Sequence, residues 1–335
     1  MNESRVYDVA TRTPISLLNK MSLQYGNEIY LKREDLQPIF SFKCRGAYNK
    51  ISSLSHEERA SGIIAASAGN HAQGVALSAS KLNIKATIVM PTTTPSIKIQ
   101  SVRKFGVKVE LIGDAFDEAY EYALEVWRKE GKVFIHPFDD PLVIAGQGTV
   151  AKEIVEEFQD KPDIFFIPVG GGGLISGMSL YLKTHYPNSK VYGVESQDAP
   201  TLFTSLENGK PTSLDQVGLF VDGCAVKRIG EETFKISKKY VDGVILVSID
   251  EICAAIKDIY EDTRVMSEPA GALSVAGMEK FLLSNEVKGK KIMAVNSGAT
   301  LTFERLRHVN ERDDMGEGKE NWWRVKIPEK PGRIR

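Results

Sequence analysis

One lysine and one run of glycines in this chain could together hold a phosphorylated aldehyde. Lys43 follows Phe42 at the edge of an apolar stretch, where an amine loses hydration and can form a Schiff base with a carbonyl group. Four glycines directly follow the apolar run 164–169, namely Gly170, Gly171, Gly172 and Gly173. Their backbone N–H groups could approach a phosphate closely. The amine and the glycines together predict a site for pyridoxal 5′-phosphate, which needs both contacts.

The glycine run does not match the two common nucleotide-binding patterns. The dinucleotide pattern G-x-G-x-x-G fails because Ile175 or Ser176 occupies the position of its last glycine. The phosphate loop of ATP-binding proteins nearly fits from Gly172 onward, but Met178 stands where a lysine is required. A helix beginning at Leu174 would place its N-terminus against an anion. We therefore expect a phosphate other than that of ATP or NAD, with a flexible turn as the alternative.

A second anion site is predicted where a strand gives way to a helix, in the segment Ser67, Ala68, Gly69, Asn70 and His71. The Ser67 hydroxyl and nearby N–H groups could bind a substrate carboxylate, and Asn70 could reach a hydroxyl of the cofactor ring. Ser67 and Asn70 are also good cap residues, so ordinary helix capping is the alternative. His71 alone is equally explained as a buried, hydrogen-bonded histidine, and the five histidines show no metal-ligand spacing.

Ser297 follows a predicted strand, Lys291–Asn296, at its carboxyl end, where ligands of open α/β sheets bind. Its hydroxyl could bond a pyridine nitrogen. A carboxylate there would keep the ring protonated, whereas a hydroxyl leaves it largely neutral and favours prompt loss of a β-leaving group. A helix cap is again the alternative.

Composition excludes several other classes of protein. At 335 residues, with 42% hydrophobic and 26% charged, the chain is long enough for two globular domains. Its 43 basic and 44 acidic residues leave a net charge of −1, which provides no overall field for nucleic acid or an anionic membrane. Cys44, Cys224 and Cys253 lie far apart, which argues against a disulfide scaffold or zinc site. Without a signal-peptide pattern or an apolar run near ~18 residues, we expect a cytoplasmic protein.

Strand-like and helix-like segments alternate along the chain. The predicted strands are Ile29–Lys32, Gly62–Ser67, Ala86–Met90, Lys108–Ile112, Asp163–Val169, Lys190–Val194 and Lys291–Asn296. The predicted helices are Ala47–Leu54, Asn70–Leu82, Lys98–Phe105, Phe116–Lys129 (capped by Asp114), Thr149–Phe158 and Leu174–Lys183. This rhythm predicts an α/β fold of open, twisted parallel sheets with helices on both faces. Beyond Arg312 we expect a polar linker, 313–321, one strand, 322–327, and a turn, 328–332, too little to fold alone.

In these motifs the chain resembles the fold-type II (tryptophan synthase beta-like) pyridoxal-phosphate enzymes, and within them the threonine dehydratases, or threonine ammonia-lyases, of the biosynthetic type. The resemblance covers about residues 5–312. It rests on the stretches 13–15, 31–35, 41–48, 67–74, 146–149, 170–177, 267–272 and 297–299.

The resemblance implies a role for each matched residue. Lys43 would be the Schiff-base lysine beside Phe42, Asn70 would bond the ring 3′-oxygen, and Ser297 would meet the pyridine nitrogen. The phosphate would lie on Gly170, Gly171, Gly172, Gly173 and Leu174. The substrate would contact Ser67, Ala68, Gly69, His71 and Gln147.

The resemblance also implies an activity and an architecture. The reaction would be α,β-elimination from L-threonine to 2-oxobutyrate and ammonia, the first committed step of isoleucine biosynthesis, with L-serine a poorer substrate. Residues 1–43 and 141–312 would form a large cofactor-binding domain, 44–140 a small substrate-closing domain, and 313–335 a linker and the start of an incomplete regulatory domain. A homodimer or homotetramer is the family habit.

Two departures and three alternatives accompany this interpretation. Thr300 and Thr302 stand where the family commonly has asparagines, and Thr201 stands where serine racemases carry a metal-binding aspartate, so no metal is expected. A serine dehydratase or serine racemase is the nearest alternative, because threonine and serine differ by a methyl group worth only ~1–3 kcal/mol. A non-catalytic pyridoxal-phosphate or amino-acid binding protein and a nucleotide-dependent enzyme are the others.

Overall fold

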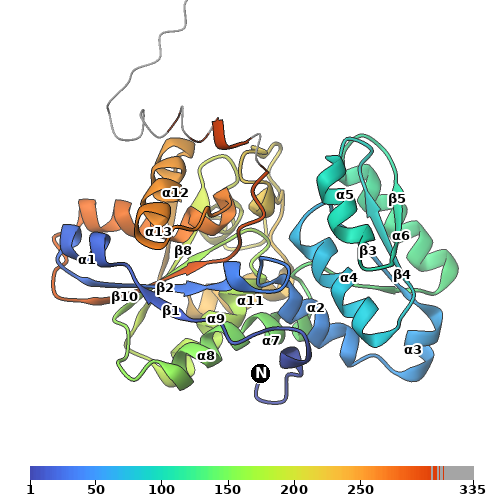
Figure 1. The fold of residues 1–335 in the computed structure, drawn as a ribbon, viewed down its shortest axis with the longest axis horizontal. Helices are drawn as coiled ribbons and strands as arrows, with labels where there is room; N and C mark the ends of the chain where they lie inside the picture. The colour runs from blue at the N-terminus through green and yellow to red at the C-terminus, as the bar shows by residue number, and fades with distance from the viewer. Residues whose placement is uncertain (303–304, 308, 310–311, 313–335) are drawn as a thin grey trace, which may run out of the picture.

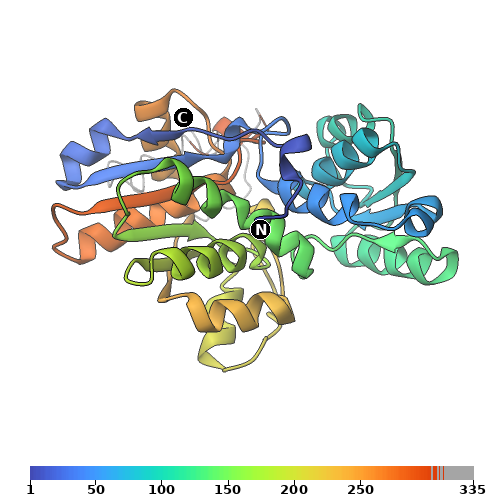
Figure 2. The same ribbon diagram turned by 90° about the horizontal axis from the view of Figure 1, so that it is seen from below.

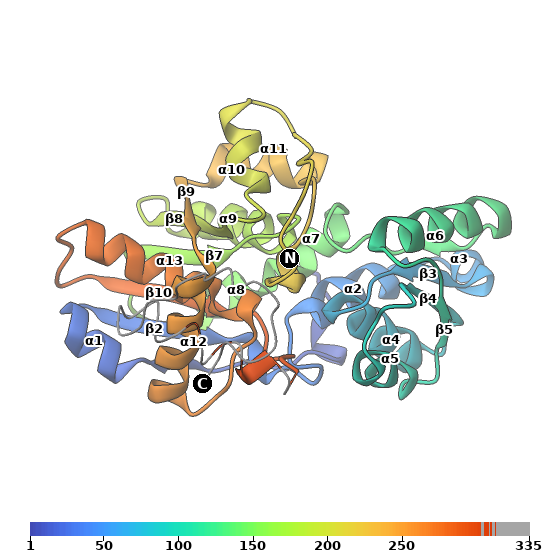
Figure 3. The ribbon, with the colours of Figure 1, turned by 90° about the horizontal axis from the view of Figure 1, so that it is seen from above.

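The computed structural model of the chain describes residues 1–302, 305–307, 309 and 312. Its strands form two sheets, each carrying its own helices, and the two halves lie side by side along the long axis in all three views (Figures 1, 2 and 3). We call the half built on six strands the large lobe and the half built on four strands the small lobe. The predicted linker, strand and turn between 313 and 332 lie outside the described residues.

The six-stranded sheet of the large lobe has the order β1-β2-β10-β7-β8-β9. In that order, its strands are Ile15–Leu17, Glu28–Arg33, Lys291–Asn296, Ile164–Pro168, Lys190–Ser196 and Gly243–Val247. All neighbouring strands pair in parallel except β1, which is antiparallel to β2. The last strand in sequence therefore lies in the middle of the sheet, with Ala294 paired to Leu31 on one side and to Phe166 on the other.

Helices cover both faces of this sheet because successive side chains of its strands point to opposite sides. In β7, Phe166 packs under α1 (Asn19–Tyr25), α12 (Ile249–Thr263) and α13 (Pro269–Ser284). Its neighbour Phe165 packs on the other side against α8 (Thr149–Glu157), α9 (Gly173–His185) and α11 (Glu231–Tyr240). Both rings are fully buried. The remaining elements of this lobe are α7 (Pro141–Gln147), α10 (Thr201–Glu207), η1 (Val6–Asp8), η2 (Glu34–Leu36) and η3 (Asp222–Cys224).

The small lobe is an all-parallel sheet in the order β5-β4-β3-β6. In that order, its strands are Lys108–Leu111, Ala86–Met90, Ile63–Ala66 and Val133–Phe134. One face packs against α2 (Lys43–Ser52), α4 (Asn70–Leu82) and α5 (Ser96–Arg103), and the other against α6 (Phe116–Glu130). A short helix, α3 (His56–Ser61), lies before β3. Helix α2 also contacts α7, so it joins the two lobes.

The predicted α/β fold with mainly parallel sheets is confirmed, and α4, β4 and β10 have the predicted bounds. Two local predictions are wrong. Helix α2 begins at Lys43 instead of Ala47, and the N-cap of α6 is Ala115 instead of Asp114. The Glu118 carboxylate accepts the N–H groups of Asp114 and Ala115, so no side-chain cap is needed, and Asp114 instead accepts the Thr92 hydroxyl. The domain boundaries at 43/44 and 140/141 stay a prediction.

A buried group of charges anchors α2 to the large lobe. Arg45 on α2 donates to Glu34 at 2.7 and 2.8 Å and to Glu153 on α8 at 2.5 and 3.0 Å. Lys32 on β2 donates to Glu153 at 2.7 Å. All four side chains are fully buried, so each charge depends on its partners for the solvation that water no longer provides.

In the part of the chain that the structure describes, no helix has both the length and the apolar composition to cross a membrane.

Candidate functional site

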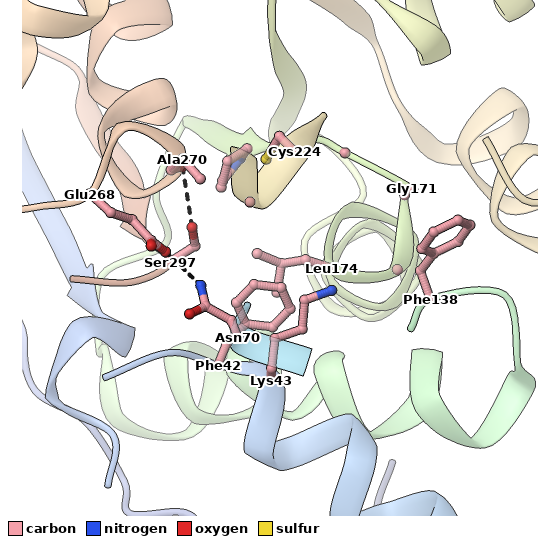
Figure 4. Close-up of a pocket in the computed structure, with 15 residues that line it drawn as sticks. Phe42, Lys43, Asn70, Phe138, Gly171, Leu174, Cys224, Glu268, Ala270 and Ser297 are labelled. Carbon is pink, nitrogen blue, oxygen red and sulfur yellow. Dashed lines mark hydrogen bonds between the residues drawn. The ribbon is translucent and has the colours of Figure 1, made fainter. Parts of the chain in front are cut away.

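A pocket lies between the lobes, beyond the carboxyl ends of the large-lobe strands. Its walls include all nine residues predicted to bind the cofactor, which are Phe42, Lys43, Asn70, Gly170, Gly171, Gly172, Gly173, Leu174 and Ser297. Strands β7 and β10 end at this pocket, and the first turns of α2 and α4 meet it from the small lobe (Figure 4). The topology thus brings together residues more than 250 positions apart in the chain.

Lys43 extends from the first turn of α2 into this pocket (Figure 4). Its ammonium donates to the Pro137 carbonyl at 3.2 Å and lies 5.2 Å from the centre of the Phe42 ring. Removal from water lowers the pKa of Lys43 to about 8, more than two units below its ordinary value of 10.5. Close packing fixes the start of the helix, since a Cβ on Gly74 of α4 would lie 2.8 Å from the Lys43 carbonyl oxygen. A substantial fraction of this amine is therefore neutral and nucleophilic near neutral pH.

The glycine run turns tightly between β7 and α9. Gly172 is the N-cap of α9 and has a φ of +90°, a backbone conformation that is strained for residues with a side chain. No side chain caps the N-terminus of this helix. A Cβ on Gly171 would stand 2.1 Å from a ring carbon of Phe138. The backbone therefore faces the pocket with bare N–H groups at the positive end of a 13-residue helix. This cradle, together with the desolvated amine, fits the phosphate and the aldehyde of pyridoxal phosphate.

We expect Gly171→Ala to weaken cofactor binding by roughly 10- to 100-fold, because the added methyl group must displace Phe138 or the loop. Titration of the cofactor-free protein by fluorescence measures the affinity. The double variant Gly171→Ala/Phe138→Ala relieves the clash and is expected to bind more tightly than Gly171→Ala alone. Unchanged affinity in Gly171→Ala would show that the cofactor does not lie on this loop.

Asn70 and Ser297 meet the pocket from opposite lobes (Figure 4). The Asn70 amide nitrogen donates to Glu268 at 2.7 Å, and its oxygen accepts the Thr300 hydroxyl at 2.8 Å. The Ser297 hydroxyl donates to the Ala270 carbonyl at 3.2 Å. The Thr300 substitution noted in the sequence therefore contacts Asn70 directly, and Ser297 stands beside it at the end of β10.

Five residues predicted to bind the substrate do not line this described pocket, namely Ser67, Ala68, Gly69, His71 and Gln147. The His71 imidazole lies 2.9 Å from the Ile135 carbonyl, and burial lowers the pKa of His71 to about 3, so the ring stays neutral. Gln147 is buried and accepts the Gly46 N–H at 3.1 Å. The cap of α4 is Gly69, and the Ser67 hydroxyl accepts its N–H at 3.2 Å. A substrate role for these five residues stays a prediction.

Sequence reasoning did not assign a role to several other lining residues, namely Phe138, Pro168, Gly223, Cys224, Glu268 and Ala270. Glu268 is the most informative of them, because a carboxyl group that is only 4% exposed needs a structural reason. The sequence did offer one indication of its position, because Glu268 precedes Pro269 and proline is common at the first position of a helix. Cys224 is also buried beside the pocket, and burial raises the pKa of its thiol to about 12.

Known proteins of similar sequence include the L-threonine dehydratase biosynthetic IlvA of Pasteurella multocida, 53% identical over 98% of this chain and 64% of its own length. The mitochondrial threonine dehydratase of Saccharomyces cerevisiae is 51% identical over 99% of this chain and 59% of its own length. The chain thus spans less than two-thirds of the length of these relatives.

Solved structures are similar as well. The processed form of threonine deaminase isoform 2 from Solanum lycopersicum superimposes with a TM-score of 0.91 at 48% identity, over 93% of this chain and 86% of that chain. Maize serine racemase superimposes with a TM-score of 0.86 at 30% identity, over 94% and 96%. These matches confirm the resemblance that the motifs indicated. The family model described as "Pyridoxal-phosphate dependent enzyme" matches residues 6–298, and the chain belongs to that family.

Proposed function

We propose that this chain converts L-threonine to 2-oxobutyrate and ammonia, as a threonine dehydratase. The observation that carries the proposal is the pocket in which the Lys43 amine, with its lowered pKa, meets the bare glycine cradle. About 50% identity to proteins named threonine dehydratase in bacteria and yeast favours threonine as the substrate. The bacterial relatives from Pasteurella multocida and Haemophilus influenzae are named as biosynthetic enzymes, which supports a role in isoleucine biosynthesis.

Pyridoxal phosphate, when bound, supplies an aldehyde for covalent attachment and a ring that accepts electrons. Lys43 provides the amine for that attachment, and, once its nitrogen is free, it removes the Cα proton and holds it at Nζ. Its lowered pKa suits this work, because a base with a pKa near the working pH keeps a usable unprotonated fraction and is still basic enough to take the proton. The β-hydroxyl takes up a proton and leaves as water, which gives an enamine; the enamine then takes up one water, releases ammonia and becomes 2-oxobutyrate.

Ser297 offers a hydroxyl and not a carboxylate at the position predicted to meet the pyridine nitrogen, so it does not enforce ring protonation. The N-terminus of α4, which no side chain caps, is proposed to bind the substrate carboxylate together with Ser67. The helix has 13 residues, so its N-terminal N–H groups carry a useful partial positive charge.

A serine racemase is a rival of similar fold, but maize serine racemase is 30% identical to this chain, against about 50% for threonine dehydratases. At the position where racemases bind a metal, the Thr201 hydroxyl donates to Glu195 at 3.0 Å. Two backbone N–H groups, of Leu202 and Phe203, also donate to Glu195. This carboxyl is therefore already supplied with protein donors, which lower its pKa, although burial outweighs them and raises the pKa of Glu195 to about 7.

We expect L-threonine to give 2-oxobutyrate with a kcat/KM roughly 10- to 200-fold above that for L-serine, because the substrate methyl group fills its own subsite. Chromatography of the oxoacid product measures both reactions. Pyruvate from serine without any 2-oxobutyrate would instead identify a serine dehydratase, and D-serine a racemase. Bound cofactor without any product would identify a binding protein.

Homo-oligomer formation and closure of the small lobe over the substrate stay predictions of the resemblance, and the cytoplasmic location stays a prediction from the sequence. Size-exclusion chromatography with light scattering measures the first of them.

A further inference from the structure

Three side chains form a closed ring across the two lobes. Asn70 opens α4 of the small lobe, while Glu268 caps α13 and Thr300 follows β10 in the large lobe. The Asn70 amide nitrogen lies 2.7 Å from one Glu268 oxygen, and the Asn70 oxygen lies 2.8 Å from the Thr300 hydroxyl. The Thr300 hydroxyl also contacts the second Glu268 oxygen. Each group therefore has both of the others as neighbours.

Counting hydrogens decides the protonation of this ring. Three contacts need three hydrogens, and Asn70 supplies one because only its nitrogen donates. Thr300 supplies one, since a hydroxyl carries a single hydrogen. Rotating the amide by 180° changes the direction of the bonds but not the count. The third hydrogen can come only from Glu268.

We propose that Glu268 is protonated in the folded protein at neutral pH and that, as a positioning residue, it holds the Asn70 amide at the pocket and joins the two lobes. In the ring, Glu268 donates to Thr300, Thr300 donates to the Asn70 oxygen, and Asn70 donates to Glu268. One N–H of Asn70 then remains for a ligand in the pocket. The protonation does not depend on the proposed function, whereas the positioning role rests on the pocket being the cofactor site.

The surroundings of Glu268 favour the neutral carboxyl. Burial raises its pKa above the ordinary 4.5 and outweighs the hydrogen bonds to Thr300 and Asn70 and the charge of Lys98, which lower it, while Asp222 on η3 adds to the increase. Lys98 on α5 and Arg305 both form ion pairs with Asp222, and within the described residues neither pairs with Glu268. Among the described residues, the other titratable groups that face it are the Lys43 amine, with its lowered pKa, and the Cys224 thiol, whose raised pKa keeps the thiol neutral.

Infrared spectroscopy of the purified full-length protein tests the protonation directly. The difference spectrum between the wild type and Glu268→Gln at pH 7 is expected to contain the carbonyl band of one protonated carboxyl, shifted in D₂O. Absence of that band would show an ionised Glu268 and overturn the proposal. Glu279→Gln is the matched control, because Glu279 is a second buried carboxyl of α13 with a raised pKa, and it does not line the pocket. Its band must persist in Glu268→Gln.

The pH dependence of thermal stability tests the protonation of Glu268 independently of any spectrum. A carboxyl whose pKa is higher in the folded than in the unfolded state stabilises the fold fully at low pH and loses that contribution as the pH rises. Glutamine cannot ionise, so it does not lose stability in this way. The Tm of Glu268→Gln minus the Tm of the wild type is therefore expected to increase as the pH rises above 4.5. A Tm difference that does not change with pH would contradict a raised pKa.

The positioning role is tested by cofactor affinity. Glutamine can keep all three contacts, because its amide donates to Thr300 and its oxygen accepts from Asn70, whereas alanine removes two of them. Glu268→Gln is therefore expected to bind pyridoxal phosphate about tenfold more tightly than Glu268→Ala. Equal weakening in both variants would mean that the negative charge matters and not the ring. None of these measurements uses threonine turnover, so their failure is distinguishable from failure of the proposed function.

Discussion

Lys43→Ala is expected to lower the production of 2-oxobutyrate by about a thousandfold or more, because the pocket loses both its covalent attachment point and its base. The variant is also expected to lose the visible absorbance that the attached cofactor gives to the purified protein. Absorption spectra and the oxoacid assay measure the two effects separately. Retention of turnover would overturn the assignment of this residue.

Lys50→Ala is the matched control for that variant, because Lys50 lies on the same helix but pairs with Asp140 and does not line the pocket. The pH dependence adds a second check. Only the neutral amine attacks an aldehyde, so the rate at which the cofactor-free protein recombines with pyridoxal phosphate is expected to rise with pH and to level off above the pKa of about 8. A midpoint near the ordinary 10.5 would indicate an exposed lysine.

Arg45→Met is expected to lower the free energy of unfolding by ~3–5 kcal/mol, the usual cost of removing one partner from a buried group of charges. The variant leaves Glu34 and Glu153 buried with only Lys32 as a cation, and the side chains of all four residues are fully buried.

Burial by itself would raise the pKa of Glu153, but Arg45 and Lys32 hold it below 4.5. The contribution of Glu153 is therefore lost as the pH falls through its folded-state pKa.

Urea unfolding followed by circular dichroism measures this loss. Arg12→Met is the matched control, because Arg12 also binds two glutamates, Glu156 and Glu157, but these pairs are exposed. Exposed pairs contribute ~0–1 kcal/mol, so the control is expected to remain close to the wild type. Equal losses in the two variants would mean that burial does not set the strength of these interactions.

Local patterns predicted those parts of the fold that local physics decides. Strands β4 and β10 have the predicted bounds because short apolar runs between turns set them, and helix α4 has its predicted bounds because it is a longer alanine-rich segment that follows a strand. The start of α6 at Phe116 was predicted correctly but its cap was not, because the Glu118 side chain captures the backbone N–H groups ahead of the helix. An aspartate before a helix and a glutamate in its first turn both fit the capping pattern, and sequence alone does not rank them.

The candidate site divides in the same way. Lys43, the glycine run and Ser297 follow strands or open helices, so their positions are visible in the order of the elements. The contact between Asn70 and Glu268 joins residues 198 positions apart and depends on how the two lobes meet. A pattern along the chain cannot show that Glu268 shares its hydrogen bonds with Thr300 and Asn70.

The central place of β10 in the large sheet affects how the protein is made on the ribosome. Strands β2 and β7 acquire their shared neighbour β10 only after residue 296 has been synthesised, since β10 pairs with both of them. Until then both nascent strands expose open edges that can pair with other chains. The small-lobe strands lie between residues 63 and 134, so that lobe can form early. A chaperone that binds exposed strands would therefore be needed most for the large lobe, during the interval before β10 is synthesised.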